Sequence, residues 1–449
     1  MKRKKFMNPF SNKEEMSPFR KMCWMLVLFP VLASGQQKIM LADAVKEGLV
    51  SNYSIRIARN SADIAKNNIN YGKAGFLPSV SAYSSLDKAS LDAKVRVQSG
   101  AKLDNKSASS TITNAGIKAQ WVLFDGAGMF AEYEKLNSLW KLSDLETRMT
   151  MENTLCGIVV AYSDIIRMEQ MLDAWRQRLN VSNFRYLIAK QKMNSGMGSE
   201  QELLQAGVLQ QSDSTEYLKQ VTAFQKSKIL LNQLLAADIK RDFMTEDSIP
   251  LVVIPPVEEL LSGALQNNIN YLHAGEALQL SRVETKMLKA GLYPKVTLNG
   301  SYGYYKLESD AAFINHNRYF GPQVGVNVGI NLFNGLQQRN QIRNARMGTE
   351  SRELFLKELE QDISALILET HYDYLNHRQT ILLARQGLNL AEKNLSIAKT
   401  AFQSGMISSL QLREAQEDLF HANASLVNAI FNAKVKETEL LKYSGMLLK

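Results

Sequence analysis

The sequence of 449 residues has few of the side chains on which redox and metal chemistry depend. Only two cysteines are present, and Cys23 lies in an apolar segment near the N-terminus. Cys156 alone remains for the rest of the chain, so no intramolecular disulfide is expected. The five histidines include no pair four residues apart, which is the spacing that places two ligands on one helix face. We therefore expect no metal site.

Motifs for catalysis are lacking as well. No nucleophile elbow, Walker or dinucleotide-binding pattern stands between a predicted strand and a predicted helix. The acidic residues are scattered at helical spacing, which is typical of a solvated helix surface rather than of paired catalytic carboxylates. We predict that the protein is not an enzyme and binds no cofactor.

The chain has little excess charge outside its N-terminal segment. Its net charge of +9 comes largely from residues 1–35, which carry seven Lys and Arg side chains against two acidic ones. The remainder holds 46 basic and 42 acidic residues. This balance gives no support to nucleic-acid binding.

Long hydrophobic runs are also absent. The run 23–32 has about ten residues against the roughly 20 that a membrane-spanning helix needs. Two basic residues precede it and small residues follow it at 33–35, which predicts a secretory signal peptide over residues 1–35, with an anchoring helix as the weaker alternative. No cysteine follows the run at the place where a lipid-anchored protein would need one, so no lipid anchor is predicted. The segment is long for a signal, which leaves three candidate start residues: Met1, Met7 and Met16.

One stretch, Val324–Phe333, alternates between Val, Ile or Leu and the small or amide residues Gly and Asn. Because successive strand side chains face opposite sides, one face is apolar and the other is small and polar. Such a strand suits a wall between lipid and a watery lumen, and about 9 to 11 residues cross a bilayer. A strand of a soluble sandwich can show the same alternation. Because no other segment can form a spanning helix, entry into a membrane would require a closed barrel.

The chain repeats itself. A shift of 216 positions places Asn52 on Asn268, and a shift of 209 places Gly196 on Gly405. The change of shift means that the first half has seven extra residues, which we expect in a polar hairpin loop within residues 97–110. A single long period of this kind indicates an internal duplication.

Each half has the order helix, strand, loop, strand and two helices. The first helix of each half is expected to run unbroken, over 41–75 and 257–291, until a Leu-Pro or Tyr-Pro pair begins the strand. The junctions between helices and strands are Pro78, Pro294, Gly126 and Gly335. The predicted domains are a first repeat over 36–237 with strands at about 79–97 and 111–124, a linker with three prolines over 238–256, and a second repeat over 257–449 with strands at about 295–306 and 323–333.

Helical periodicity follows the second strand of each half. Apolar residues recur in steps of three and four over 381–402, and the positions 209 earlier, 172–193, follow the same register. No proline interrupts residues 130–194, and 65 residues at about 1.5 Å each predict a rod roughly 100 Å long. The rods should end at Gly196 and Gly405, because glycine allows the left-handed conformation that terminates a helix.

These features together resemble the TolC-like outer-membrane efflux protein family of Gram-negative bacteria, over essentially everything after the predicted signal. The matching features are the duplicated order of elements, the Leu-Phe-Asp/Asn-Gly exit at Leu123–Gly126 and Leu332–Gly335, and the tip sequence G-x-x-S-x-x-E-L-L-x-A at Gly196–Ala206. The second tip, Gly405–Ala415, departs from the pattern because Gln411 stands where an acid is typical.

The resemblance implies a mainly α-helical fold with a membrane β-barrel portion. In a homotrimer, each chain would give four strands to one 12-stranded barrel in outer-membrane lipid, continued by a long periplasmic α-helical barrel. Such a channel exports substrates passively, with an inner-membrane transporter and a periplasmic adaptor as partners. The family moves drugs, metals, siderophores and polypeptides, and the sequence does not name the cargo.

The resemblance also implies roles at the two tips. Glu414 would line the pore, although an ordinary solvated helix residue is equally consistent with its position. Ile407 stands where some members have a locking arginine, so any lock here must differ. The residues expected to shape the tips and dock the adaptor are Gly196, Ser199, Glu202, Leu203, Gly405, Ser408 and Leu412, and those expected at the pore aperture are Gln411 and Glu414.

Two other functions remain open from the sequence alone. The first is a periplasmic coiled-coil adaptor or structural interaction protein without a membrane barrel. The two strand pairs, each with an apolar outer face, argue against it. The second is an envelope hydrolase with a helical arm, which would need a clustered nucleophile and base.

Overall fold

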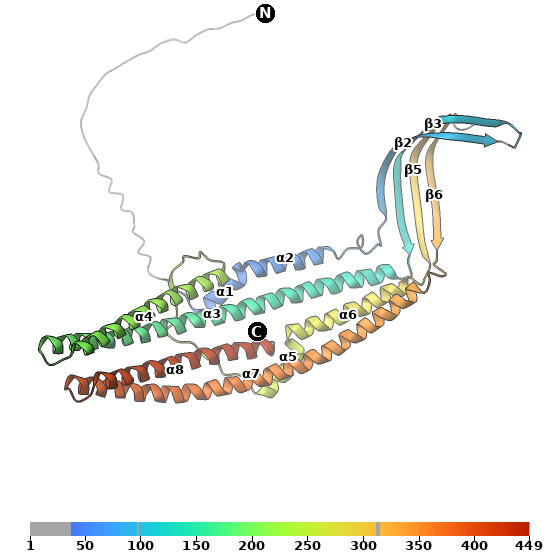
Figure 1. Ribbon diagram of the computed structural model, residues 1–449. Coiled ribbons are helices and arrows are strands. Elements are labelled where there is room, and N and C mark those ends of the chain that lie inside the picture. The colour runs from blue at the N-terminus through green and yellow to red at the C-terminus, as the bar shows by residue number, and fades with distance from the viewer. Residues whose placement is uncertain (1–36, 97, 311–314, 449) are drawn as a thin grey trace, which may run out of the picture.

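The computed structural model describes residues 37–96, 98–310 and 315–448. Figure 1 shows long helices lying side by side, with a curved sheet at one end. The predicted signal peptide and the candidate start residues lie outside the described residues. Among the described residues, none of the helices contains a stretch long and apolar enough to span a lipid bilayer.

The sheet has four antiparallel strands in the order β2-β3-β5-β6. Each strand pairs with the next along this order, and the two halves of the chain meet where β3 pairs with β5. The outer edges of β2 and β6 therefore have no strand partner among the described residues. The strands are β2 (Ser79–Arg96), β3 (Lys102–Phe124), β5 (Lys295–Ser309) and β6 (His316–Gly329).

The first hairpin differs from its prediction. Residues 102–110 do not form a loop: they belong to β3 and pair with β2 in a two-stranded ribbon that extends past the ends of β5 and β6 (Figure 1). A register shift between Leu91 and Ala93 bends this ribbon. The polar composition hid the strand, because ladder hydrogen bonds between backbones do not require apolar side chains.

The last strand is also displaced from its prediction. β6 begins at His316 and ends at Gly329, so the stretch 330–333 is not in the ladder. Gly329 pairs with Lys295, the first residue of β5, and no earlier residue of β5 remains for Ile330 to pair with. The side chain of Leu332 is 88% exposed. The alternation of apolar residues therefore continues beyond the strand itself.

The first helix of each half was expected to be continuous. In the structure it is broken into two helices. Asn52 and Asn268 stand at the breaks with extended ψ angles of 127° and 120°. Each side chain accepts hydrogen bonds from backbone N–H groups of the following helix, which makes it an N-cap. The helices are α1 (Leu41–Ser51), α2 (Tyr53–Asn67), α5 (Val257–Asn267) and α6 (Ile269–Ala290), so α2 ends well before Pro78.

The rods are α3 (Gly128–Asn194) and α7 (Gln337–Gln403), each of 67 residues, and the returning helices are α4 (Glu200–Leu235) and α8 (Ser409–Tyr443). Helix α3 contacts both α4 and α8, and α8 contacts α7, so the helices follow the order α4-α3-α8-α7. The predicted linker packs on this layer: β4 (Phe243–Met244) pairs with β1 (Gln37–Lys38), and Phe243 is fully buried.

Candidate functional site

The two turns at the ends of the rods have the same geometry. Gly196 and Gly405 both have a φ of +73°. A Cβ added at either position would meet nothing within 4 Å, so the backbone conformation rather than space calls for glycine. The following residues, Met197 and Met406, donate their N–H groups to carbonyls of the preceding turn and leave their side chains 79% exposed.

Serine caps the helix that follows each turn. The Ser199 Oγ accepts the N–H of Glu202 at 3.2 Å, and the Ser408 Oγ accepts the N–H of Gln411 at 3.3 Å. In the second tip the Gln411 Oε1 also accepts the N–H of Ser408 at 2.9 Å, which completes a capping box. The side chain of Gln411, which we had expected at the pore aperture, is thus held against its own helix terminus.

The two tips differ in their packing. Leu412 is fully buried against Val181, Leu395 and Phe402, whereas its counterpart Leu203 is only half-buried. The reason is the helix order: α8 lies between the two rods α3 and α7, whereas α4 has one rod, α3, beside it and otherwise contacts only the short helix α1 among the described elements. Glu202 is half-buried and Glu414 is exposed to solvent.

A polar network joins the two helical hairpins above the tips. The Arg178 guanidinium on α3 donates to Asp213 on α4 at 2.9 Å and to both carboxylate oxygens of Glu417 on α8 at 2.9 and 3.1 Å. The guanidinium also lies over the rings of Trp175 and Phe420, at 5.1 Å from each. One arginine therefore links three helices.

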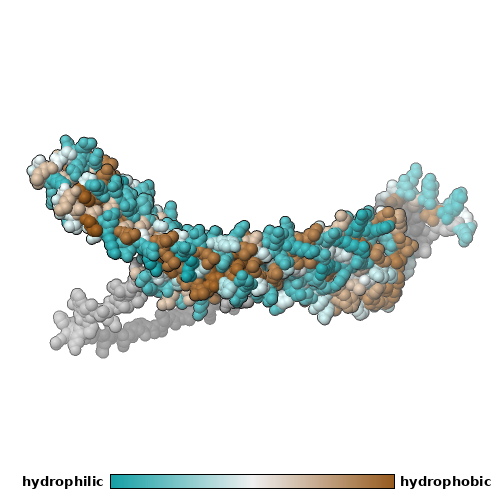
Figure 2. Space-filling view, turned by 90° about the horizontal axis from the view of Figure 1, so that it is seen from below, coloured by the Kyte–Doolittle hydropathy of each residue, from teal (hydrophilic) through white to brown (hydrophobic). Residues whose placement is uncertain are grey.

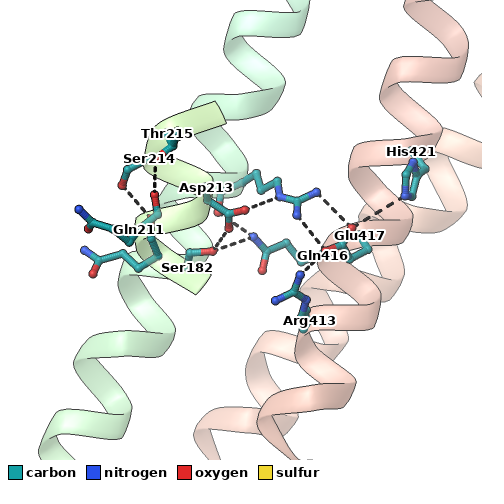
Figure 3. A network of polar contacts seen from close by, with 11 residues as sticks. Ser182, Gln211, Asp213, Ser214, Thr215, Arg413, Gln416, Glu417 and His421 are labelled. Atoms are coloured by element: carbon teal, nitrogen blue, oxygen red, sulfur yellow. Dashed lines mark hydrogen bonds and ion pairs between the residues drawn. The ribbon is translucent and has the colours of Figure 1, made fainter. Parts of the chain in front are cut away.

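Figure 3 shows how the other members converge. The Gln416 amide donates to the Arg178 carbonyl oxygen at 2.7 Å and to the Ser182 hydroxyl at 3.2 Å, and that hydroxyl donates to Asp213. Arg413 pairs with Glu417 at 3.1 Å. This network was missed in the sequence because its members come from distant segments. Position 387, which matches Arg178 in the other half, is a glycine, so comparison of the two repeats did not single out Arg178.

The junctions between strand and rod require the left-handed conformation. Gly126 and Gly335 have φ angles of +71° and +66°, and each is followed by a second residue of positive φ. A Cβ at Gly126 would lie 2.4 Å from the Ala290 carbonyl oxygen, whereas one at Gly335 would meet nothing. The first junction is thus packed against the second half of the chain, and the second junction is bare. Pro78 and Pro294 each directly precede the first residue of a strand.

The register gives the sheet two unlike faces. Val328 pairs with Val296 and Val326 with Leu298, which in turn pairs with Trp121, so apolar side chains share one face across three strands. The opposite face is hollowed by a cavity of about 340 Å³. Its lining includes Ser79, Ser81, Lys118, Gln120, Asn299, Ser301 and Gln323.

Within the described ranges, no group of three or more His, Cys, Asp and Glu side chains is placed to hold a metal ion. Cys156 is a free thiol in the interior of α3. Burial lowers the pKa of the Arg185 guanidinium, and the charge of Arg413 lowers it further. Arg185 donates to the Ser409 hydroxyl at 3.0 Å, a further link between α3 and α8.

Comparison with known proteins agrees with this architecture. A model of the outer membrane efflux protein family matches residues 44–237 and 260–446. The outer membrane protein TolC of Vibrio cholerae serotype O1 is 23% identical over 354 residues, 74% of each chain, and the outer membrane efflux protein BepC of Brucella suis biovar 1 is 20% identical over 445 residues, 95% of this chain and 91% of that one.

Among solved structures, the CmeC outer membrane channel of Campylobacter jejuni superposes with a TM-score of 0.75 at 14% identity and covers 91% of this chain and 86% of that one. At this identity the likeness shows the fold. The family model spans most of the chain in two segments, which the linker separates. The chain therefore belongs to the outer membrane efflux protein family, and its function is that of an outer-membrane efflux channel.

Proposed function

We propose that this chain is one protomer of a homotrimeric conduit. Its four strands would form one third of a 12-stranded barrel in outer-membrane lipid, and α3, α4, α7 and α8 one third of a helical barrel in the periplasm. Substrates delivered by an inner-membrane transporter and a periplasmic adaptor would pass through without energy input from this protein. The number three rests on the family, and the need for neighbours rests on the exposed faces of the chain.

One observation carries the proposal. Helix α2 exposes the side chains of Tyr53, Ile57 and Ile64, each by 63% or more, at a spacing that places them on one face. The positions 216 later on the chain are all half-buried or buried, and Ile269 is 2% exposed against 64% for Tyr53. Helix α6 packs along both α3 and α7, whereas α2 packs along α3 and otherwise contacts only the short helix α1 among the described elements.

The exposed face of α2 and the covered face of α6 are what we expect when a single subunit is taken out of a ring of repeats. Contacts that the first half makes with the second inside the chain would recur between the second half and the first half of the next subunit. The bare junction at Gly335, the exposed face of α2 and the outer edges of β2 and β6 would all find partners there. Figure 2 shows hydrophobic patches along the helical part on the face in view.

The sheet edges add an energetic argument. In lipid no water is available to the backbone groups of an edge strand, and each unpaired group costs several kcal/mol. Four strands do not close on themselves here, because the order runs from β2 to β6 without a contact between these two. Pairing β6 with β2 of a partner subunit would remove both edges.

The repeat predicts the register of that pairing. Inside the chain Ala119 pairs with Gly300. The counterpart of Ala119 in the second half is Val328, and the counterpart of Gly300 in the first half is Ser84. The same pairing between subunits would therefore place Val328 opposite Ser84 of the partner subunit. Both positions lie on the apolar face, as the pleat requires.

The register can be tested by cross-linking in membranes. In a Cys156→Ser background, Val328→Cys combined with Ser84→Cys should link chains into covalent dimers and trimers on mild oxidation. The matched control, Val328→Cys with Ser85→Cys, places the second thiol on the opposite face and should not link. Linking of the control pair, or a monomer extracted without detergent, would contradict the proposal.

The tips would be where the adaptor docks, and Glu414 would set the charge of the aperture. The exposed side chains of Met197 and Met406 at the turns, and of Leu204 and Leu410 near the start of the helices that follow, support a docking role, because apolar side chains in this number are uncommon on a solvated helix end. Glu414→Gln should reduce the preference for cations in planar bilayers. Unchanged ion selectivity would remove Glu414 from the aperture.

A further inference from the structure

A cavity of about 420 Å³ lies where the two helical hairpins meet, above the tips. Its walls come from three helices: α3 over 174–184, α7 over 395–403 and α8 over 416–423. Pockets that bind drug-sized molecules span about 300–1,000 Å³, so this cavity is large enough for a small organic ligand.

The floor of the cavity is apolar and fixed in position. Val181 and Leu395 are each 5% exposed, and Phe184, Leu419 and Phe420 are half-buried beside them. The ring of Phe420 lies 4.5 Å from that of Trp175 and under the Arg178 guanidinium. Because these contacts hold the ring, the wall is preformed and a ligand would not have to order it.

The charged residues that line the cavity have one sign. No acidic side chain belongs to the lining, which contains the two cations Arg178 and Lys399. Arg178 is neutralised by Asp213 and Glu417, whereas no ion pair is recorded for the exposed Lys399 among the described residues. Amide side chains complete the rim: Gln177, Asn180, Gln403 and Asn423. The available charge therefore favours an anion, with hydrogen-bonding groups beside it.

We propose that this cavity binds a drug-sized amphipathic anion. An aromatic or otherwise apolar body would lie against Val181, Phe184 and Leu419, and the anionic group would lie near Lys399 at the rim. Such a ligand touches both hairpins at once, since α3 belongs to one and α7 and α8 to the other. Bound there, it would hold the hairpins at their present separation, a consequence that rests on the proposed channel function, whereas the binding itself does not.

The test compares two probes that share their rings and differ in charge. 1-Anilinonaphthalene-8-sulfonate carries one sulfonate, and N-phenyl-1-naphthylamine lacks it. Each is titrated by fluorescence into the full chain in lipid nanodiscs, with empty nanodiscs as the blank. We expect saturable binding of the sulfonate at one molecule per chain, and weaker binding of the neutral amine.

Variants locate the binding. Asn180→Trp places a large ring at the rim and should weaken sulfonate binding about tenfold or more, a loss of about 1.4 kcal/mol. Asn389→Trp, at an exposed position of α7 outside the lining, should leave it unchanged. Lys399→Gln should weaken the sulfonate about twofold to fivefold and leave the amine unaffected, whereas Lys393→Gln should change neither.

Two results would overturn the proposal: no saturable binding above the nanodisc blank, or saturable binding that Asn180→Trp leaves intact. Failure of the channel proposal would appear elsewhere, in the cross-linking of Val328 with Ser84. The two outcomes are therefore separable.

Discussion

The two tips share their turn and differ in their surroundings. Both end a rod of 67 residues in a glycine of φ +73° and begin the next helix with a serine cap. Yet Leu412 is fully buried and Leu203 half-buried, because α8 lies between two rods and α4 lies at the edge of the layer. The shared Ser-Gly-Met turn and serine cap thus give the same backbone, while the position of a helix in the layer decides how firmly its tip is held.

The largest effect should come from truncating the two leucines. Leu412→Ala removes a fully buried side chain and should cost about 4 kcal/mol of local stability, against about 1 kcal/mol for Leu203→Ala. Hydrogen exchange of peptides covering 404–420 and 196–210 measures both. Equal acceleration at the two tips would show that both leucines are buried in the assembled protein.

Breaking the link between the hairpins should come next. Arg178→Gln leaves Asp213, which is 6% exposed, without its charge partner and should cost about 3 kcal/mol. We expect higher single-channel conductance in planar bilayers, because α3, α4 and α8 lose the one side chain that binds all three. The control is Arg176→Gln, whose pair with Asp173 is exposed and should contribute less than about 1 kcal/mol. Unchanged conductance in a folded Arg178→Gln protein would make the network purely structural.

The two rods should also respond differently to pH. Burial raises the pKa of Glu152 from 4.5 to about 7, against the weaker opposing charges of Lys442 and Arg148. Between these values the folded state holds a proton that the unfolded state has released, so stability declines as the pH rises through this window. The matching position of α7 is Gln361, which does not titrate.

Glu152→Gln makes the first rod resemble the second in this respect. At pH 8 the variant should be more stable than the natural protein by about 1–3 kcal/mol, and at pH 4 the two should be alike. Thermal unfolding at both pH values measures the difference. A decline between pH 4.5 and 7 that persists in the variant would assign it to another buried acid, such as Glu437, whose pKa burial also raises.

The smallest effect should be the same in both halves. Asn52 and Asn268 each cap a helix, and each also donates a hydrogen bond to the end of a returning helix. The acceptor is the Leu234 carbonyl for Asn52 and the Tyr443 carbonyl for Asn268, each at a distance of 2.8 Å. Replacement by Ala should cost about 1–2 kcal/mol at either position. Asn389→Ala, at an exposed position of α7, is the control and should have little effect. Unequal losses would mean that only one of the two anchors holds its hairpin.

Sequence patterns predicted the rods and turns well because local chemistry decides them. The absence of proline over 130–194 and the glycines at 196 and 405 fix a helix and its end without tertiary information. The Asn52 break was missed because asparagine is tolerated inside helices, and the contact of its side chain with the Leu234 carbonyl joins residues far apart in the sequence. The Arg178 network was out of reach, since it joins residues up to 239 positions apart.

The equal length of the two rods has a consequence for any partner. Both rods descend by the same number of residues, so the two turns of a chain end at a similar depth. A protein that engages one turn is then held within reach of the other, and the second contact forms at an effective concentration in the millimolar range. Two individually weak contacts would then combine into one high-affinity attachment. Shortening a single rod by two helical turns would abolish this simultaneous binding without altering either contact surface.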